Sequence, residues 1–245
     1  MIPALALLFV PLLQEPDVPV VEPPEPPPTV EEEETGYLFP AWIYAPRGEE
    51  RIKMHLVATG VREKTIFRVN VYGFAMYLNL DEAMPHLRQA ARGLSEKKAV
   101  KSKEFQRSLL SDAFGKSMRW EMARNVEAED IREAFEDILE PRIEDYTEDD
   151  PEAREAARAA LRQFRSFFER PVEKHDILVF HWEPGGRLHT VIAGEDMAVI
   201  ENVWLCRAIF DVYFGPDADM TSFRKDFIRN LWRQLQAHFE REASR

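Results

Sequence analysis

Residues 175–194, HDILVFHWEPGGRLHTVIAG, constrain the fold more than any other part of this sequence. Two runs rich in β-branched and aromatic residues flank the Pro-Gly-Gly at 184–186, and glycines at such a position close a tight turn between paired strands. The pattern predicts a β-hairpin, whose two strands must run antiparallel. The folded region therefore contains a sheet that is antiparallel at least here.

Runs of the same kind recur earlier in the chain. β-branched and aromatic residues bounded by turn formers lie at 41–45, 51–60, 64–69 and 71–80, and another such run lies at 117–126. Short strands that follow one another so closely predict an antiparallel meander.

Helical spacing fills the segments between and after the strands. Residues 81–93 predict a helix with Asp81 as its N-cap and Gly93 as its stop. The apolar spacing predicts further helices at 127–143, 151–170, 197–215 and 219–242. Strands, then helices, then a hairpin, then more helices predict an α+β fold with a mostly antiparallel sheet covered by helices.

The N-terminal part differs in composition from the rest. Residues 1–14 hold an apolar run of about a dozen residues, which is the length of a signal-peptide core and below the roughly 20 residues that span a bilayer. Residues 15–35 are dense in Pro and Glu, which predicts a disordered linker. We expect a signal peptide or hydrophobic leader, this linker, and one domain at 36–240.

These N-terminal features predict a protein exported to the periplasm or the cell envelope. An uncleaved anchor and a misplaced start are the alternatives. Contact with a membrane is expected only through the leader, if it remains uncleaved. The net charge of −12 and the sequence pI near 5.1 disfavour nucleic acid and anionic membranes as main partners, because both attract basic surfaces.

Three histidines on or beside the hairpin raise the question of a metal site. His181 and His189 are predicted to lie opposite each other on the two strands, and His175 precedes the first strand. A zinc site usually needs three protein ligands, and no Cys or acidic third ligand lies at a suitable spacing. We therefore expect no metal site.

Arg62 lies in the stretch LVATGVREKTIFRVNVYGFAMYL at 56–78. An arginine at such a place can pair with Glu63, Glu121 or another carboxylate and so hold the sheet together. It can also be the cation at the mouth of an apolar cavity. The residues alone leave both alternatives open.

Three segments resemble the chalcone isomerase-like family: ATGVREKTIFRVNVYGFAMYL at 58–78, SMRWEMARNVEAEDIREAFEDIL at 117–139 and MAVIENVWLCRAIFDVYFG at 197–215. The leader and linker fit the bacterial, exported branch of that family. The resemblance implies a curved antiparallel sheet with helices layered on one face, an open-faced sandwich with a cleft between the two layers.

The resemblance also implies a reaction. In the plant enzymes an arginine holds the phenolate of a chalcone while its oxygen adds across the conjugated double bond, which would make Arg62 the electrophilic residue of an intramolecular lyase. The polar positions of that enzyme site fall here at Tyr72, Ile131, Ala134, Ile138 and Val212, with Tyr213 following. Four of them have become apolar, which leaves the cation without the groups that would orient an enone.

An arginine and a tyrosine at one end of an apolar cleft suit an acid with an apolar tail. This combination resembles the non-catalytic, fatty-acid-binding branch of the family, which implies a small apolar or amphiphilic ligand and no cofactor. The expected ligand-binding residues are Arg62, Tyr72, Ile131, Ile138, Val212 and Tyr213. The lyase is one alternative, and a carrier of haem or another tetrapyrrole, with a His or Tyr on the iron, is another.

Overall fold

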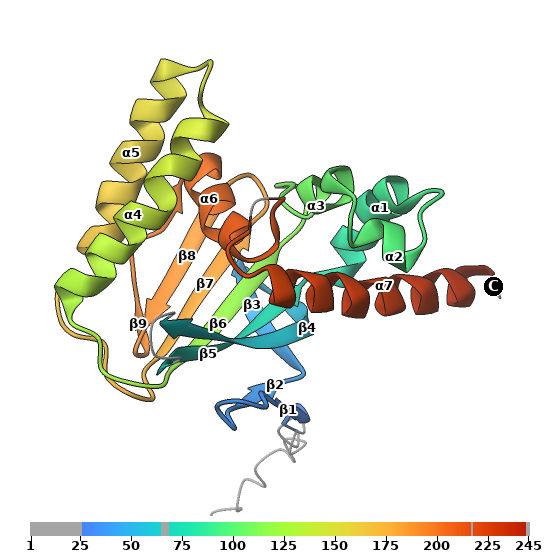
Figure 1. Ribbon diagram of the computed structural model, residues 1–245, viewed down its shortest axis with the longest axis horizontal. Coiled ribbons are helices and arrows are strands. Elements are labelled where there is room, and N and C mark those ends of the chain that lie inside the picture. Colours follow the sequence, from blue (N-terminus) through green and yellow to red (C-terminus); the bar gives the residue numbers. More distant parts are fainter. Residues whose placement is uncertain (1–25, 65–68, 217, 244–245) are drawn as a thin grey trace, which may run out of the picture.

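The computed structural model describes residues 26–64, 69–216 and 218–243, and an antiparallel sheet forms its centre (Figure 1). The sheet has eight strands in the order β10-β8-β7-β6-β5-β4-β3, with β9 paired to β8 outside this path. It curls strongly, since β3 contacts β7 although β4, β5 and β6 lie between them in the sheet. The strands are β3 (Trp42–Arg47), β4 (Glu50–Lys64), β5 (Val69–Leu78), β6 (Lys116–Met122), β7 (Ile177–Glu183), β8 (Arg187–Ile192), β9 (Glu195–Asp196) and β10 (Ile200–Glu201).

The helices form two groups that meet at α6 and α7. Helices α4, α5 and α6 pack on one another and reach β8 and β10, whereas α7 packs on β4 and α2 (Figure 1). No helix within the described ranges is long and apolar enough to cross a membrane. The helices are α1 (Leu80–Ala91), α2 (Glu96–Ala99), α3 (Lys103–Ser108), α4 (Ala128–Tyr146), α5 (Pro151–Ser166), α6 (Val203–Phe214) and α7 (Thr221–Ala243).

This arrangement confirms the predicted α+β fold, a curved antiparallel sheet with helices. The hairpin is also confirmed: β7 and β8 pair antiparallel, and Gly185 and Gly186 adopt positive φ angles of 86° and 84° in the turn. Glycine reaches such angles without the steric cost that a Cβ would impose, which is why this turn could be predicted.

The alternation of side chains along β5 divides the apolar core into two parts. Tyr72, Phe74 and Met76 belong to the larger cluster, which the helices cover. Ala75 and Tyr77 belong to a smaller cluster on the opposite face of the sheet. The strand therefore supplies one face of a helix-covered layer in which a cavity can form.

A short hairpin precedes the main sheet. Strand β1 (Thr29–Glu31) pairs antiparallel with β2 (Leu38–Pro40). In the connecting turn the Glu32 carboxylate accepts hydrogen bonds from the backbone N (2.9 Å) and the hydroxyl (2.6 Å) of Thr35. Phe39 of β2 is fully buried in the smaller core cluster, so the hairpin is tied to the domain.

This hairpin changes the boundary of the expected linker. The predicted leader at 1–14 and the linker as far as residue 25 lie outside the described residues. In the rest of the linker the structure has a strand at 29–31, before the expected domain start at 36. The composition predicted disorder because it does not reveal that the segment pairs with a later strand.

The start of α1 also differs from the prediction. Asn79, not Asp81, is the N-cap, and its side chain accepts a hydrogen bond from the backbone N of Glu82 (3.2 Å). Asp81 lies instead in the first turn, where its negative charge suits the helix dipole. Both residue types are good caps, so local preference could not decide between them.

Two further segments differ from the predicted boundaries. The helix expected at 197–215 begins only at Val203, because 200–201 pair with β8 and Asn202 caps the helix through the backbone N of Leu205 (2.9 Å). The two end residues of the strand expected at 64–69 belong to two different strands: Lys64 is the last residue of β4, and Val69 is the first residue of β5. Residues 65–68 lie outside the described residues.

Candidate ligand cavity

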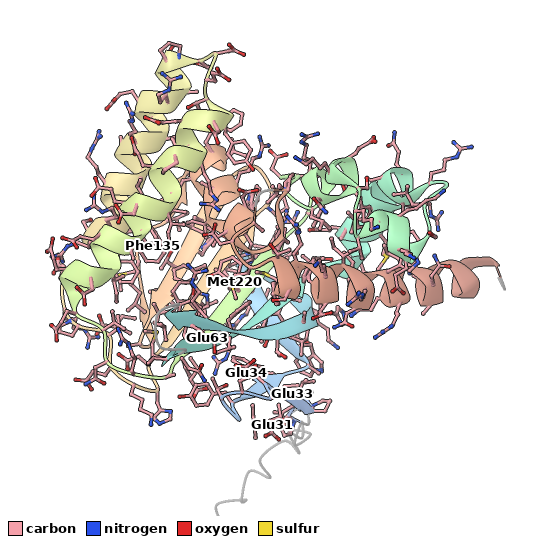
Figure 2. All side chains as sticks on the ribbon, in the orientation of Figure 1. Glu31, Glu33, Glu34, Glu63, Phe135 and Met220 are labelled. Atoms are coloured by element: carbon pink, nitrogen blue, oxygen red, sulfur yellow. The ribbon has the colours of Figure 1, made fainter. Side chains whose placement is uncertain are left out.

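A cavity of about 450 Å³ lies between the sheet and helices α4 and α6. Strands β4 to β7 supply one wall and the two helices supply the other. Figure 2 labels two of the lining residues, Phe135 on α4 and Glu63 near the end of β4. The wall is largely apolar and includes Val71, Met122, Val126, Phe135, Leu178 and Ile209.

All six residues predicted from the sequence to bind a ligand line this one cavity. They come from four elements that are far apart in the chain: Arg62 on β4, Tyr72 on β5, Ile131 and Ile138 on α4, Val212 and Tyr213 on α6. The structure thus brings the set together. Its role in binding stays a prediction.

Arg62 is held beside Tyr72 by the register of the sheet, because the two residues face each other in the β4–β5 pair. The side chain is half-buried. It forms no hydrogen bond or ion pair with any residue in the described part of the chain. Neither Glu63 nor Glu121 is its partner; Glu121 lies 3.2 Å from His175 instead. Among the described residues, therefore, Arg62 does not pair with a carboxylate to hold the sheet together.

Two tyrosines connect the sheet to α6 beside this arginine. The hydroxyl oxygens of Tyr72 and Tyr213 lie 2.7 Å apart, in a hydrogen bond that either can donate. The Tyr72 ring stacks on Trp120 with a centroid distance of 3.9 Å, and the Tyr213 ring meets Phe74 edge-on at 5.0 Å. These contacts fix both hydroxyls at one end of the cavity.

Burial keeps both hydroxyls protonated. It raises the pKa of Tyr72 to about 12, against the opposing effects of the Tyr213 hydrogen bond and the charge of Arg62. Burial also raises the pKa of Tyr213 well above its usual value. Near neutral pH the pair therefore consists of two neutral hydroxyls, each with a proton to donate. A guanidinium and a hydroxyl pair with one proton left to donate, at one end of an apolar cavity, can hold an acidic group whose apolar remainder fills the space.

The family profile described as "Chalcone isomerase like" matches residues 52–228. The chain belongs to the chalcone isomerase-like family. Its sequence is 24% identical over 208 residues to "Fatty-acid-binding protein 1" of Arabidopsis thaliana, covering 82% of this chain and 70% of that protein. It is 27% identical over 190 residues to "Fatty-acid-binding protein 2" of the same plant, covering 75% of this chain and 46% of that protein.

A solved structure of the chalcone isomerase-like family has the same fold. The crystal structure of the Arabidopsis thaliana fatty-acid binding protein 1 superposes with a TM-score of 0.71 at 23% identity, over 85% of this chain and 99% of that one. The predicted shape, with its curled antiparallel sheet and helices, is thereby confirmed.

Helix α4 carries the apolar wall of the cavity in this family member. Ile131, Ala134, Phe135 and Ile138 follow the spacing of one helix face, and all four line the cavity. The acidic residues of α4 that also touch the cavity are exposed: Asp130, Glu133 and Asp137. Water can therefore reach the rim, while the apolar face of α4 offers no side-chain group to a polar substrate.

The cavity residues that were not predicted from the sequence include two with nitrogen donors, Trp120 and Arg124. The indole Nε1 of Trp120 and the Nε of Arg124 are buried, and neither has a hydrogen-bond partner among the described residues. The strand predicted at 117–126 carried a signal that could have found them, because positions 120, 122 and 124 share one side of an extended chain.

The hairpin histidines lie on the other face of the sheet. His181 and His189 face each other in the β7–β8 pair, as predicted. His181 is hydrogen-bonded to the Ser117 hydroxyl (2.7 Å) and His189 to the Glu183 carboxylate (2.8 Å). Within the described ranges no group of three or more His, Cys, Asp or Glu residues is placed to hold a metal ion.

Proposed function

We propose that this protein binds a fatty acid or a similar apolar acid in the cavity and does not convert it. The observation that carries the proposal is Arg62, a half-buried cation that forms no ion pair with the described residues and lies at the polar end of an apolar cavity. The names of the two Arabidopsis thaliana relatives support the same ligand class.

The geometry suits a carboxylate followed by an alkyl chain. The Arg62 guanidinium can donate two parallel hydrogen bonds to a carboxylate. The bond between Tyr72 and Tyr213 uses only one of their two hydroxyl protons, so the other can be donated to the ligand. Ile138 and Val212 would then cover the chain.

Two alternatives have less support. A lyase would need polar groups to order water and orient an enone, and the positions that supply them in the plant enzymes are apolar on α4 here. A haem carrier would use a His or a Tyr on the iron. No histidine is among the described residues that line the cavity, and the hydroxyls of its two tyrosines, Tyr72 and Tyr213, are hydrogen-bonded to each other at 2.7 Å.

The test compares Arg62→Gln with the matched control Arg51→Gln, an exposed arginine on the same strand. Isothermal titration with dodecanoate at pH 7.5 measures the dissociation constant of each full-length variant. Arg62→Gln should weaken binding about 10-fold to 100-fold, the equivalent of a charge-assisted hydrogen bond of roughly 1.5–3 kcal/mol. Arg51→Gln should bind like the parent protein.

The same variants separate binding from stability. Since Arg62 has no ion pair in the described part of the chain, Arg62→Gln should change the free energy of unfolding by less than about 1 kcal/mol. Severe unfolding with unchanged dodecanoate affinity would contradict the proposal. So would acceleration of chalcone cyclisation by the parent protein that is lost in Arg62→Gln, because that result would make it a lyase.

We also propose that the chain belongs to the exported bacterial branch of the family and acts in the periplasm or cell envelope. The apolar run at 1–14 and the Pro/Glu-rich segment after it support this. Fractionation of cells that express the full chain, with N-terminal sequencing of the product, tests it. Recovery of the uncleaved chain from the cytosol alone would contradict export.

A further inference from the structure

The cavity holds more hydrogen-bond donors than a carboxylate needs. Besides Arg62 and the tyrosine pair, Trp120 and Arg124 line it, and neither the indole Nε1 of Trp120 nor the Nε of Arg124 has a hydrogen-bond partner among the described residues. Trp120 is only 7% exposed, so ordinary solvent contact does not satisfy its N–H. Buried donors in native proteins nearly always have an acceptor, and an indole N–H or a guanidinium can only donate. A ligand in this cavity that carries additional acceptors would lie next to both residues.

The sheet places the two arginines at the same end of the cavity. Arg62 faces Tyr72 across β4 and β5, and Tyr72 faces Met122 across β5 and β6. Neighbouring strands are about 4.8 Å apart, so the α-carbons of Arg62 and Met122 are separated by roughly 10 Å. Arg124 follows two residues after Met122. Two arginine side chains can meet across such a span.

Arg124 has the same electrostatic character as Arg62. Its side chain is half-buried, and it forms no ion pair or hydrogen bond with any residue in the described ranges. The acids of α4 that line the cavity, Asp130, Glu133 and Asp137, are all exposed, so water and salt screen them. Glu63, which is half-buried, also lines the cavity but lies beyond ion-pair distance of both arginines. One monoanionic carboxylate would balance only one of the two cations.

We infer that Arg62 and Arg124 at this polar end form a two-arginine clamp for a dianionic head group. The ligand is a single-chain lipid phosphate, which the site binds in preference to a carboxylate of the same chain length. The inference rests on the proposed function, because the apolar wall must hold an alkyl chain in either case. A phosphate monoester carries about two negative charges above its second pKa near 6 and offers three acceptor oxygens. The third oxygen and the second charge match the second guanidinium and the indole N–H, whereas a carboxylate offers two oxygens and one charge to the same donors.

The experiment uses the full-length protein and three probes with the same twelve-carbon chain: dodecyl phosphate, dodecanoate and dodecyl sulfate. Titration below their micelle concentrations at pH 7.5 should show dodecyl phosphate binding at least 10-fold more tightly than the other two. Dodecyl sulfate has as many terminal oxygens but only one charge, so it separates charge from oxygen count. At pH 5.0, where the phosphate is a monoanion, the preference over dodecyl sulfate should disappear.

Variants then assign the preference to its residue. In Arg124→Gln the ratio of dodecyl phosphate affinity to dodecanoate affinity should fall to near one, while Arg51→Gln should keep the parent ratio. Trp120→Phe keeps the stacked ring but removes the N–H, and it should reduce the ratio several-fold. Inorganic phosphate should bind at least 100-fold more weakly than dodecyl phosphate; comparable binding would overturn the assignment to a lipid.

The outcomes distinguish this inference from the proposed function. If dodecanoate binds with a need for Arg62 but dodecyl phosphate gains nothing, the two-arginine clamp is wrong and the fatty-acid site stands. An equal loss of both ligands in Arg124→Gln overturns the clamp in the same way. If none of the twelve-carbon probes binds, both proposals are wrong.

Discussion

Replacement of Tyr72 by Phe removes one partner from a hydrogen bond between the sheet and α6. The two hydroxyl oxygens lie 2.7 Å apart, and Tyr72 and Tyr213 are 8% and 2% exposed. Each single Tyr→Phe change leaves the other hydroxyl without its partner, which should lower the free energy of unfolding by about 1–2 kcal/mol. The lower half of this range applies if water enters the cavity and reaches the remaining hydroxyl.

The double replacement should behave differently from the sum of the two. It leaves no hydroxyl behind, and the ring contacts with Trp120 and Phe74 do not need the oxygens. We therefore expect the double variant to lose no more stability than either single variant, which gives a coupling energy of about 1 kcal/mol or more.

Urea denaturation of the parent, both single variants and the double variant, at pH 7.5 without ligand, measures this coupling. Tyr44→Phe is the matched control, since Tyr44 is 50% exposed and should change stability by less than about 0.5 kcal/mol. For a protein of this size, 1 kcal/mol corresponds to a change of about 2–4 °C in Tm. If the losses in the single variants simply add in the double variant, the two hydroxyls do not depend on each other and the reasoning fails.

Two other predictions concern stability. Gly186→Ala should lower the free energy of unfolding by more than about 2 kcal/mol, because φ is 84° and the new Cβ would lie 2.8 Å from the backbone N of Val203. Gly48→Ala is the control, since Gly48 has φ 58° but open space around it, and this change should cost only about 1 kcal/mol. Denaturant titration of both variants checks this, and equal losses would contradict it. Burial, together with the charge of His189, lowers the pKa of His181 from the usual 6.5 to about 4. As the pH falls, His181 is therefore protonated in the unfolded chain before it is protonated in the folded protein. The free energy of unfolding should fall between pH 6.5 and pH 4, by at most about 3 kcal/mol. The free energy of unfolding, measured at several pH values, should fall less between pH 6.5 and pH 4 in His181→Asn than in the parent protein. An equal fall in both would show that other groups cause the acid sensitivity.

The fold could be predicted where local chemistry and pattern agree. The hairpin at 175–194 has turn glycines between two β-rich runs, so neither the turn nor the pairing of His181 with His189 depends on distant contacts. The strand at 29–31 is the opposite case. The Pro and Glu content of the segment 15–35 around it favours an extended, disordered chain, but the strand pairs with β2, whose buried Phe39 ties the hairpin to the domain.

The candidate site was predicted in part for a similar reason. Arg62, Tyr72 and Tyr213 lie within segments that resemble a known family, so the sequence was enough to expect that they meet. Arg124 also lies within such a segment, 117–139, but at none of the positions that the resemblance assigns to the site. It lies two residues after the end of β6, where an arginine is usually solvated, and only the register across β4, β5 and β6 brings it to the same cavity end as Arg62.

The sheet and α4 contribute different parts of the chemistry. The backbone pairing of β4, β5 and β6 fixes Arg62 and Tyr72, so an anion site there does not depend on the nature of the opposite wall. Four apolar α4 residues that line the cavity can change without disturbing that pairing: Ile131, Ala134, Phe135 and Ile138. Polar residues at these positions would order water around a reacting enone, whereas the apolar ones present exclude water and cover a chain. Arg62 alone is therefore compatible with a lyase or a carrier, and it is the apolar face of α4 that favours the carrier.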